Sequence, residues 1–297
     1  MVRRKAMKKS LSEKTAYVLI IFVLVIFTVA TVYPIIHVVM ASFSDGDLMM
    51  AHQGLLLRPL EFNVDAYKRV FENEMIMRGY LNTIIVVAAT LILNFLLTSF
   101  AAYFLSRKYL YTANAVMFFI MVTMYFSGGT VPFYFAVKNL GLYNSLWSII
   151  LPASANAFNI IVLRTAFSSM PDSIEEAALV DGANHFTILF KIFIPLSKAS
   201  LAVVMLYYLV AHWNSWFNAM IFLKDRELYP LQLVLRDILV ENDTSNMTGG
   251  ASMDTMQAVG ETVKYAVIVV STLPVMMIYP FLQKYFAKGA MVGAVKG

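Results

Sequence analysis

The sequence predicts an all-α membrane protein with six transmembrane helices in a single domain, residues 1–297. Hydrophobic residues make up 60% of the chain and charged residues 14%, whereas soluble domains carry about 25% charged residues. Six stretches contain no Asp, Glu, Lys or Arg, and each is long enough to cross a bilayer, which takes about 20 apolar residues. The expected spans lie near residues 16–41, 80–105, 110–127, 144–167, 200–223 and 264–283.

The basic residues are distributed unevenly over the segments that join these spans. With six spans, the side that holds both termini carries 14 of the 23 Lys and Arg residues but only 5 of the 18 Asp and Glu residues. Cytoplasmic loops of membrane proteins carry an excess of Lys and Arg. Both termini, and the loop between the fourth and fifth spans, are therefore expected in the cytoplasm. The net charge of +5 follows from this bias, so it gives no support to nucleic-acid binding.

A glycine pair, Gly128 and Gly129, follows the third expected span. Glycine weakens a helix and Pro132 can restart one, so the helix is expected to break at the pair. Residues 131–142 are then expected to form a re-entrant or surface-lying piece, with an ordinary outer loop as the alternative.

The loop between the fourth and fifth spans, residues 171–195, is charged although it lies between long apolar segments. Asp172 and Glu175 have the spacing of a helix capping box, which satisfies backbone amides at the start of a helix. We therefore expect a helix to begin at Ser173.

The same loop contains signals for the end of that helix and for a second one. Gly182 is expected to follow the C-cap of the first helix, because glycine readily adopts positive φ. Ala177 and Ala178 would let another surface approach the first helix closely. A second short helix is expected over residues 185–193, ending before Pro195.

This loop resembles the EAA loop of ABC importer permeases, a cytoplasmic element that docks on an ATPase subunit. Two further segments, LKDRELYPLQLVLRDIL and QKYFAKGAMVGAVKG, resemble the carbohydrate-uptake branch of that family. Within the branch, the chain is similar to the second permease of maltose-type systems and to permeases for plant or algal polysaccharide fragments, including fragments that contain uronates. The matching loop residues are Glu176, Ala177, Ala178, Gly182, Ile192, Ile194 and Pro195, with Ile194 where the family usually has Leu.

The resemblance implies a type I importer bundle in the bacterial cytoplasmic membrane. It implies a heterodimer with a second permease, two ATPase subunits that hold ATP and Mg, an external solute-binding protein and an oligosaccharide substrate. No cofactor is expected on this chain. In the ATPase contact, Glu176 would supply the charge, the alanine pair the close packing and Gly182 the elbow. The implied coupling residues are Glu176, Ala177, Ala178, Asp181, Gly182 and Pro195.

The sequence offers little to an enzyme. It contains no HExxH, GxSxG or GxxxxGK[ST] pattern and no Cys, so no metalloprotease, nucleophile-elbow or phosphate-binding motif is present. His37 and His212 are the only ionisable side chains within the six charge-free stretches apart from tyrosines. Proton-coupled transport usually needs such groups at depth, so that mechanism is disfavoured. ATP hydrolysis is expected on a separate subunit.

Uncharged polar residues occur within the spans at helical spacing. Tyr207, Asn214 and Asn218 would share one face of a continuous fifth helix, which is expected to face the bundle interior. Amides bind sugar hydroxyls and aromatic rings stack on sugar faces. The candidates for a substrate pathway are Tyr125, Asn156, Asn159, Tyr207, His212, Trp213, Asn214 and Asn218. A second stripe, Thr83, Thr90, Asn94 and Thr98, is interpreted as packing.

Three alternatives stay open at this stage. Polar residues in membrane bundles often serve only as hydrogen-bonded packing. A permease for amino acids, peptides or phosphate would use the same machinery, although charged solutes favour basic residues at depth. A membrane scaffold without transport would not need a charged docking helix between two spans.

Overall fold

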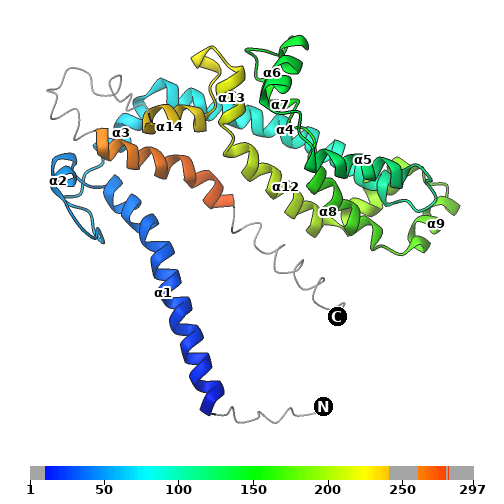
Figure 1. Ribbon diagram of the computed structural model, residues 1–297, viewed down its shortest axis with the longest axis horizontal. Coiled ribbons are helices and arrows are strands. Elements are labelled where there is room, and N and C mark those ends of the chain that lie inside the picture. Colours follow the sequence, from blue (N-terminus) through cyan, green and yellow to red (C-terminus); the bar gives the residue numbers. More distant parts are fainter. Residues whose placement is uncertain (1–10, 241–259, 279, 281–297) are drawn as a thin grey trace. The chain divides into compact units, whose positions relative to one another are not determined.

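The computed structural model describes residues 11–240, 260–278 and 280, and these ranges form helices and connecting loops without a strand (Figure 1). The chain divides into two compact units. The first comprises Met1–Val70 and Thr244–Val269, and the second comprises Phe71–Asp243 and Val270–Gly297.

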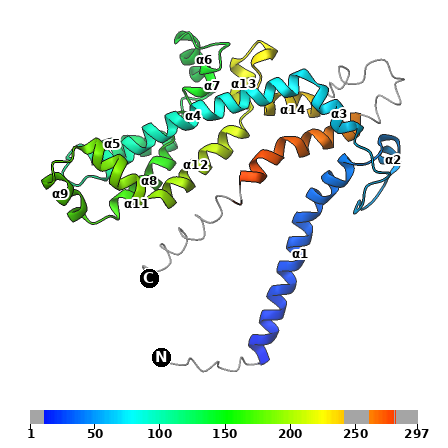
Figure 2. The same ribbon diagram turned by 180° about the vertical axis from the view of Figure 1, so that it is seen from behind.

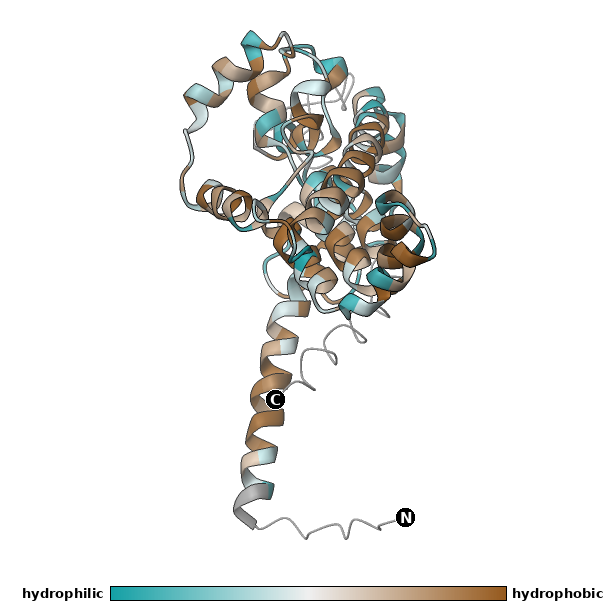
Figure 3. Cartoon of the chain, turned by 90° about the vertical axis from the view of Figure 1, so that its right-hand side faces the viewer, coloured by the Kyte–Doolittle hydropathy of each residue, from teal (hydrophilic) through white to brown (hydrophobic). Residues whose placement is uncertain are grey.

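Helix α1, Leu11–Ser42, begins the described part of the first unit. Figure 3 shows mostly apolar residues along the middle of this helix, and its apolar side chains are largely exposed. Such a helix is stable only in an apolar solvent, so α1 is suited to contact lipid or another membrane helix. A short loop with helix α2, Gly46–Ala51, follows. Its backbone returns to the end of α1, since the Asn63 amide donates to the Phe43 carbonyl at 2.8 Å.

Helix α4, Glu74–Ser106, is the central element of the second unit. It packs against α8, Ala157–Ser168, α12, Lys198–Trp213, and α14, Leu231–Val240 (Figure 2). Helix α3, Asp65–Glu72, precedes it. At the crossing of α4 and α14, a Cβ atom on Gly79 would lie 3.2 Å from the Cα of Leu231. Glycine at this position therefore allows the two backbones to approach closely.

The polar stripe on α4 lies in these helix contacts, which confirms its interpretation as packing. Thr83, Thr90, Asn94 and Thr98 are all buried. The Thr83 hydroxyl accepts a bond of 2.8 Å from the Leu231 amide, and Thr98 pairs with the Tyr208 hydroxyl at 2.8 Å. The stripe thus satisfies backbone and side-chain groups of neighbouring helices, as polar residues in membrane bundles do.

Three helices are long and apolar enough to cross a membrane by themselves: Lys14–Ser42, Glu74–Ser106 and Gly260–Ile278. Two bent pairs raise this number to five in the described part of the chain. One pair is α5, Ala113–Tyr125, with α6, Thr130–Asn139, which meet at 117°. The predicted glycine break is confirmed, because Gly129 has φ of +84° at the start of α6. The total of six spans stays a prediction.

Residues 144–167, which are expected to form one span, do not form one continuous helix. Helix α7, Trp147–Ile150, ends before Pro152, and α8 begins only at Ala157. Proline has no amide hydrogen and its ring disfavours a helix interior. The Asn156 side chain then caps α8 by accepting from the Asn159 amide at 3.2 Å.

The expected continuous helix over residues 200–223 is wrong. Helix α12 ends at Trp213, and α13, Phe217–Phe222, follows after a break. The Asn214 side chain donates back to the Val210 carbonyl at 2.9 Å. Such a local side-chain bond competes with continuation of the helix. Asn218 consequently lies on a different helix from Tyr207, so the predicted stripe is not formed. A 3₁₀ turn, Arg226–Leu228, connects α13 to α14.

Candidate functional site

Helix α9, Asp172–Val180, lies beside the C-terminal end of α4 (Figure 1). The predicted capping box is wrong, and the helix begins one residue earlier than expected, because Pro171 holds the N-cap position without a side-chain bond. The Asp172 carboxylate instead pairs with Lys108 Nζ at 2.8 Å. That contact lowers the pKa of Asp172, mainly through the hydrogen bond from Lys108 and then through its charge.

The end of α9 follows the prediction. Gly182 has φ of +78°. Its amide donates to the Leu179 carbonyl at 3.0 Å, and the Ala183 amide donates to the Ala178 carbonyl at 2.9 Å. These two bonds form the Schellman motif that ends a helix on glycine. Gly182 therefore creates the predicted elbow.

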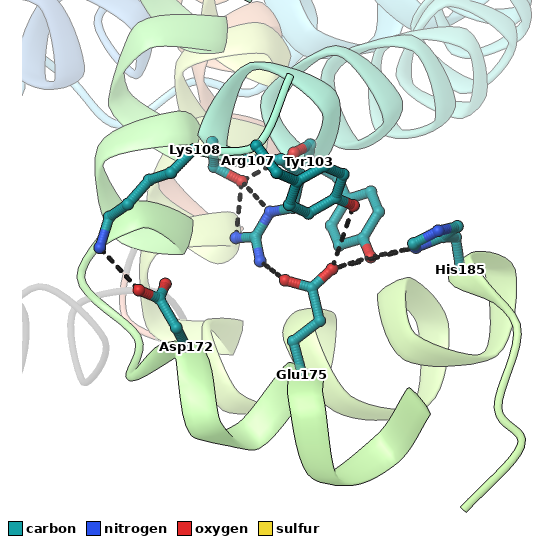
Figure 4. Close-up of polar contacts among 8 residues, drawn as sticks. Tyr103, Arg107, Lys108, Asp172, Glu175 and His185 are labelled. Atoms are coloured by element: carbon teal, nitrogen blue, oxygen red, sulfur yellow. Dashed lines mark hydrogen bonds and ion pairs between the residues drawn. The ribbon is translucent and has the colours of Figure 1, made fainter. Parts of the chain in front are cut away.

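Glu175 and Arg107 form a buried ion pair beneath α9, between Glu175 Oε2 and Arg107 Nη1 (Figure 4). Their side chains are 7% and 6% exposed. The Tyr103 hydroxyl donates to Glu175 Oε1 at 2.9 Å, and Ser106 Oγ accepts from Arg107 Nε at 3.1 Å. Buried charges need such partners, because an unpaired one is strongly unfavourable. This cluster attaches α9 to the end of α4.

Two further contacts extend the cluster to the segment after the elbow. His185 Nδ1 lies 3.0 Å from the Tyr103 hydroxyl. Because that hydroxyl donates its hydrogen to Glu175, the hydrogen of the second bond lies on His185 Nδ1. The Arg107 guanidinium lies over the Phe193 ring, 4.5 Å from its centroid. Residues before and after Gly182 thus contact Arg107 or its neighbour Tyr103.

The alanine pair is divided between two environments. Ala178 is buried in the chain's own apolar core with Phe167 and Phe193, so the expectation that both alanines face a partner is wrong for Ala178. Glu176 and Ala177 are exposed. The outer face of α9 is completed by Val180, which is 88% exposed. An apolar side chain this exposed on a charged loop is suited to contact another surface.

Pro195 does not end the second helix of the loop. Helix α10, His185–Ile188, continues through a π-helical turn, Leu189–Phe193, into α11, Ile194–Leu196. A π-helical turn often occurs where a residue interrupts the regular hydrogen bonds of an α-helix. Pro195 is such a residue, because it has no amide hydrogen. The chain then bends by 88° into α12.

A cavity of about 600 Å³ lies between the start of α8 and the face of α12. It brings together four of the predicted pathway residues: Asn156, Asn159, Tyr207 and His212. The remaining wall consists of uncharged residues, Pro152, Ala153, Ala155, Phe158, Tyr208 and Ala211. His212 Nε2 lies 2.8 Å from Asn94 Oδ1, which ties the cavity wall to the α4 stripe.

The other pathway candidates do not line this cavity. Trp213 is buried, and its indole nitrogen donates to the Ser271 carbonyl at 3.1 Å. Tyr125 is 82% exposed at the end of α5. Asn214 is exposed at the helix break, and Asn218 is half-buried on α13. Within the described ranges, no three His, Asp or Glu side chains are placed to hold a metal ion.

Residues 109–292, which include α9 and the cavity, match the family of the binding-protein-dependent transport system inner membrane component. The match extends over more than half of the chain. The chain belongs to this family.

Curated relatives cover almost the whole permease. The polygalacturonan/rhamnogalacturonan transport system permease protein YtcP of Bacillus subtilis (strain 168) is 40% identical over 92% of this permease and 96% of the relative. Protein LplC of the same organism is 35% identical over 90% of both chains. The permease is also similar to a chain in the crystal structure of a bacterial ABC transporter that imports the acidic polysaccharide alginate. That comparison gives a TM-score of 0.86 and 33% identity, over 95% of this permease and 100% of the other chain.

The residues beneath α9 are not indicated by the sequence patterns. Arg107 counted only as part of a basic turn, and Glu175 only as a capping residue, while Tyr103 and His185 were not singled out. Two features of the sequence could have indicated this pair. Arg107 directly follows a long apolar stretch, and Glu175 is a second acidic residue directly before Glu176. The pairing itself joins residues far apart in sequence, so local patterns could not identify it.

Proposed function

We propose that this permease is one of two membrane subunits of an ATP-driven importer for oligosaccharides. The similarity to transport permeases for polygalacturonan, rhamnogalacturonan and alginate supports this substrate class. The cavity supports it too, since its walls are uncharged and carry carboxamide and aromatic groups.

The observation that carries the coupling role is the buried attachment of α9 to α4. We infer that the ATPase docks on the outer face of α9, where Glu176, Ala177 and Val180 are exposed, with Asp181 and Gly182 at its end. A helix attached to the protein only through the loops at its two ends could move independently of the rest of the bundle when another subunit displaced it. The Arg107–Glu175 pair resists this, so displacement of α9 moves the end of α4 with it. Pro195 lies in α11, just before the 88° bend that leads into α12.

The partners and the orientation follow from the same proposal. A second permease completes the pathway, two ATPase subunits hold ATP and Mg, and an external solute-binding protein delivers the sugar. The distribution of Lys and Arg supports cytoplasmic termini and a cytoplasmic α9. The N-terminal residues 1–10 and the segment 281–297, which carries part of the family resemblance, lie outside the described residues. The membrane is the bacterial cytoplasmic membrane.

We propose that the sugar passes the cavity between α8 and α12. Of the predicted pathway residues, Asn156, Asn159, Tyr207 and His212 line it. Helices that border a transport pathway carry polar side chains which lipid would not tolerate. Asn214 and Asn218 remain candidates for other parts of the pathway.

The experiment is reconstitution of the complete complex. The tagged permease is purified from its source bacterium with its bound subunits and placed in proteoliposomes with the solute-binding protein. Uptake of labelled rhamnogalacturonan oligosaccharide should require ATP on the α9 side and the binding protein on the other side. Uptake of amino acids or phosphate by the same proteoliposomes, without sugar uptake, would contradict the oligosaccharide assignment. A preparation that never contains an ATPase would contradict the importer role.

A further inference from the structure

The cavity between α8 and α12 contains a hydrogen-bond acceptor whose identity follows from its neighbours. Asn94 Nδ2 donates to the Ala153 carbonyl at 2.9 Å, so Asn94 Oδ1 is the atom that faces His212. That oxygen only accepts, and His212 Nε2, 2.8 Å away, must therefore carry the hydrogen. In a neutral imidazole the other nitrogen is then an acceptor. His212 Nδ1 receives no hydrogen bond from the part of the chain that the structure describes.

Asn159 provides a second acceptor in the same cavity. Its side chain is almost completely buried, with the residue 4% exposed. Its Oδ1 atom has no hydrogen-bond partner among the described residues, although Asn159 lines the cavity. A buried carboxamide oxygen without a donor is unfavourable and rare. A ligand that brings a hydroxyl group into the cavity would satisfy it.

The cavity also contains an aromatic wall. The rings of Phe158 and Tyr207 lie with centroids 6.2 Å apart at an angle of 47°, and both side chains are exposed. The C–H face of a pyranose packs well on such rings, while its hydroxyls bond to neighbouring polar groups. Among the described residues, no Lys, Arg, Asp or Glu lines the cavity.

We propose that this cavity is a subsite for one neutral pyranose unit, which donates ring hydroxyls to His212 Nδ1 and Asn159 Oδ1 and packs on Tyr207 and Phe158. This inference rests on the proposed oligosaccharide import and adds the chemistry of one unit. A uronate carboxylate in the same place would lie against these two acceptors, and no Lys or Arg among the described residues of the wall would balance its charge. The subsite therefore takes the neutral unit of a mixed polysaccharide fragment and excludes the acidic one.

The test compares two probes of equal length in proteoliposomes that contain the complete complex. One is a rhamnogalacturonan tetrasaccharide, which has neutral rhamnose units, and the other is a galacturonan tetrasaccharide, which has none. The native complex should import the first faster. Asn159→Leu removes one acceptor at similar volume and should reduce the ratio of the two rates about tenfold. Thr165→Val, on the same helix, is the control, because the Thr165 hydroxyl bonds only to the Ile161 carbonyl within α8.

A second variant keeps the proposal testable if Asn159→Leu fails to fold. Ala211→Arg places a cation at the cavity wall and should shift the preference toward the galacturonan probe. Equal import of the two probes by the native complex, or a ratio that neither variant changes, would overturn the neutral subsite and leave the importer function intact. If the native complex imports neither probe, the proposed oligosaccharide function is wrong as well. Thermal stability of each variant is recorded, since a purely structural Asn159 would lower stability without changing the ratio.

Discussion

Arg107, at the end of α4, and Glu175, on α9, form an ion pair that is almost completely buried between two elements 68 residues apart in sequence. A neighbouring pair, Lys108 and Asp172, joins the same two elements at the surface, with side chains 76% and 57% exposed. The two pairs have the same charges and similar positions but different access to water. They therefore offer a matched comparison.

Arg107→Met should destabilise the permease by about 3 to 5 kcal/mol, because it leaves the Glu175 carboxylate buried without its cation. Lys108→Met should cost less than about 1 kcal/mol, since exposed ion pairs contribute little. Thermal unfolding of the purified complex measures both. If the two variants unfold at the same temperature, the buried pair does not hold α9 in place.

The double variant Arg107→Met/Glu175→Gln separates stability from coupling. It should recover most of the lost stability, because a neutral pair removes the uncompensated charge while the Gln oxygen still accepts from Tyr103. We expect basal ATP hydrolysis to persist, and its stimulation by the loaded binding protein to fall. Full stimulation in a stable double variant would show that the ion pair is not needed for transmission from α9 to α4.

Gly182→Val should weaken ATPase binding, because a β-branched residue at φ of +78° is strained. The expected cost is about 1 to 2 kcal/mol at the elbow. No atom of the described residues lies within 4 Å of a Cβ added there, so the effect comes from the backbone and not from a clash. Gly182→Asn is the control, since Asn tolerates this conformation. Equal loss of ATPase in both variants would point to contact with the glycine surface instead of backbone geometry.

Glu176→Lys should abolish co-purification of the ATPase while leaving the permease folded, because Glu176 is exposed and has the acidic position of the docking motif. Charge reversal at a docking contact costs several kcal/mol by placing like charges together. Glu72→Lys makes the same change in charge on an exposed residue of α3, which is expected outside the cytoplasm. Retention of the ATPase by Glu176→Lys would remove this residue from the interface.

The orientation is tested with single cysteines, which is simple because the chain has none. A membrane-impermeant thiol reagent added to intact cells should label a cysteine at Leu55, which is 73% exposed on the loop after α2. It should not label a cysteine at Asn184, beside the elbow, until the cells are opened. Labelling of Asn184→Cys in intact cells would place α9 on the wrong side for an ATPase.

The sequence by itself determined the features that depend on composition and on local backbone geometry. Long charge-free stretches indicated membrane helices because lipid excludes charge. The presence of the helix, glycine elbow and second helix in the 171–195 loop was predicted correctly. A helix end of this kind depends only on the positive φ of Gly182 and on two hydrogen bonds between residues close in sequence. The family resemblance depended on the same local spacing.

Tertiary structure decided which groups meet. Glu175 was predicted to cap a helix, but its carboxylate binds Arg107. The buried guanidinium at the end of α4 needs a negative partner, whereas water can solvate a backbone amide at the start of a helix. The breaks before Asn156 and after Trp213 depend on Pro152 and on the side chain of Asn214, and they ended the stripe that a continuous helix would have formed. The cavity that contains Asn159 and His212 forms where the helix break before α8 lies beside α12. Periodicity within one segment contains no information on such pairings, since they are selected by packing between segments.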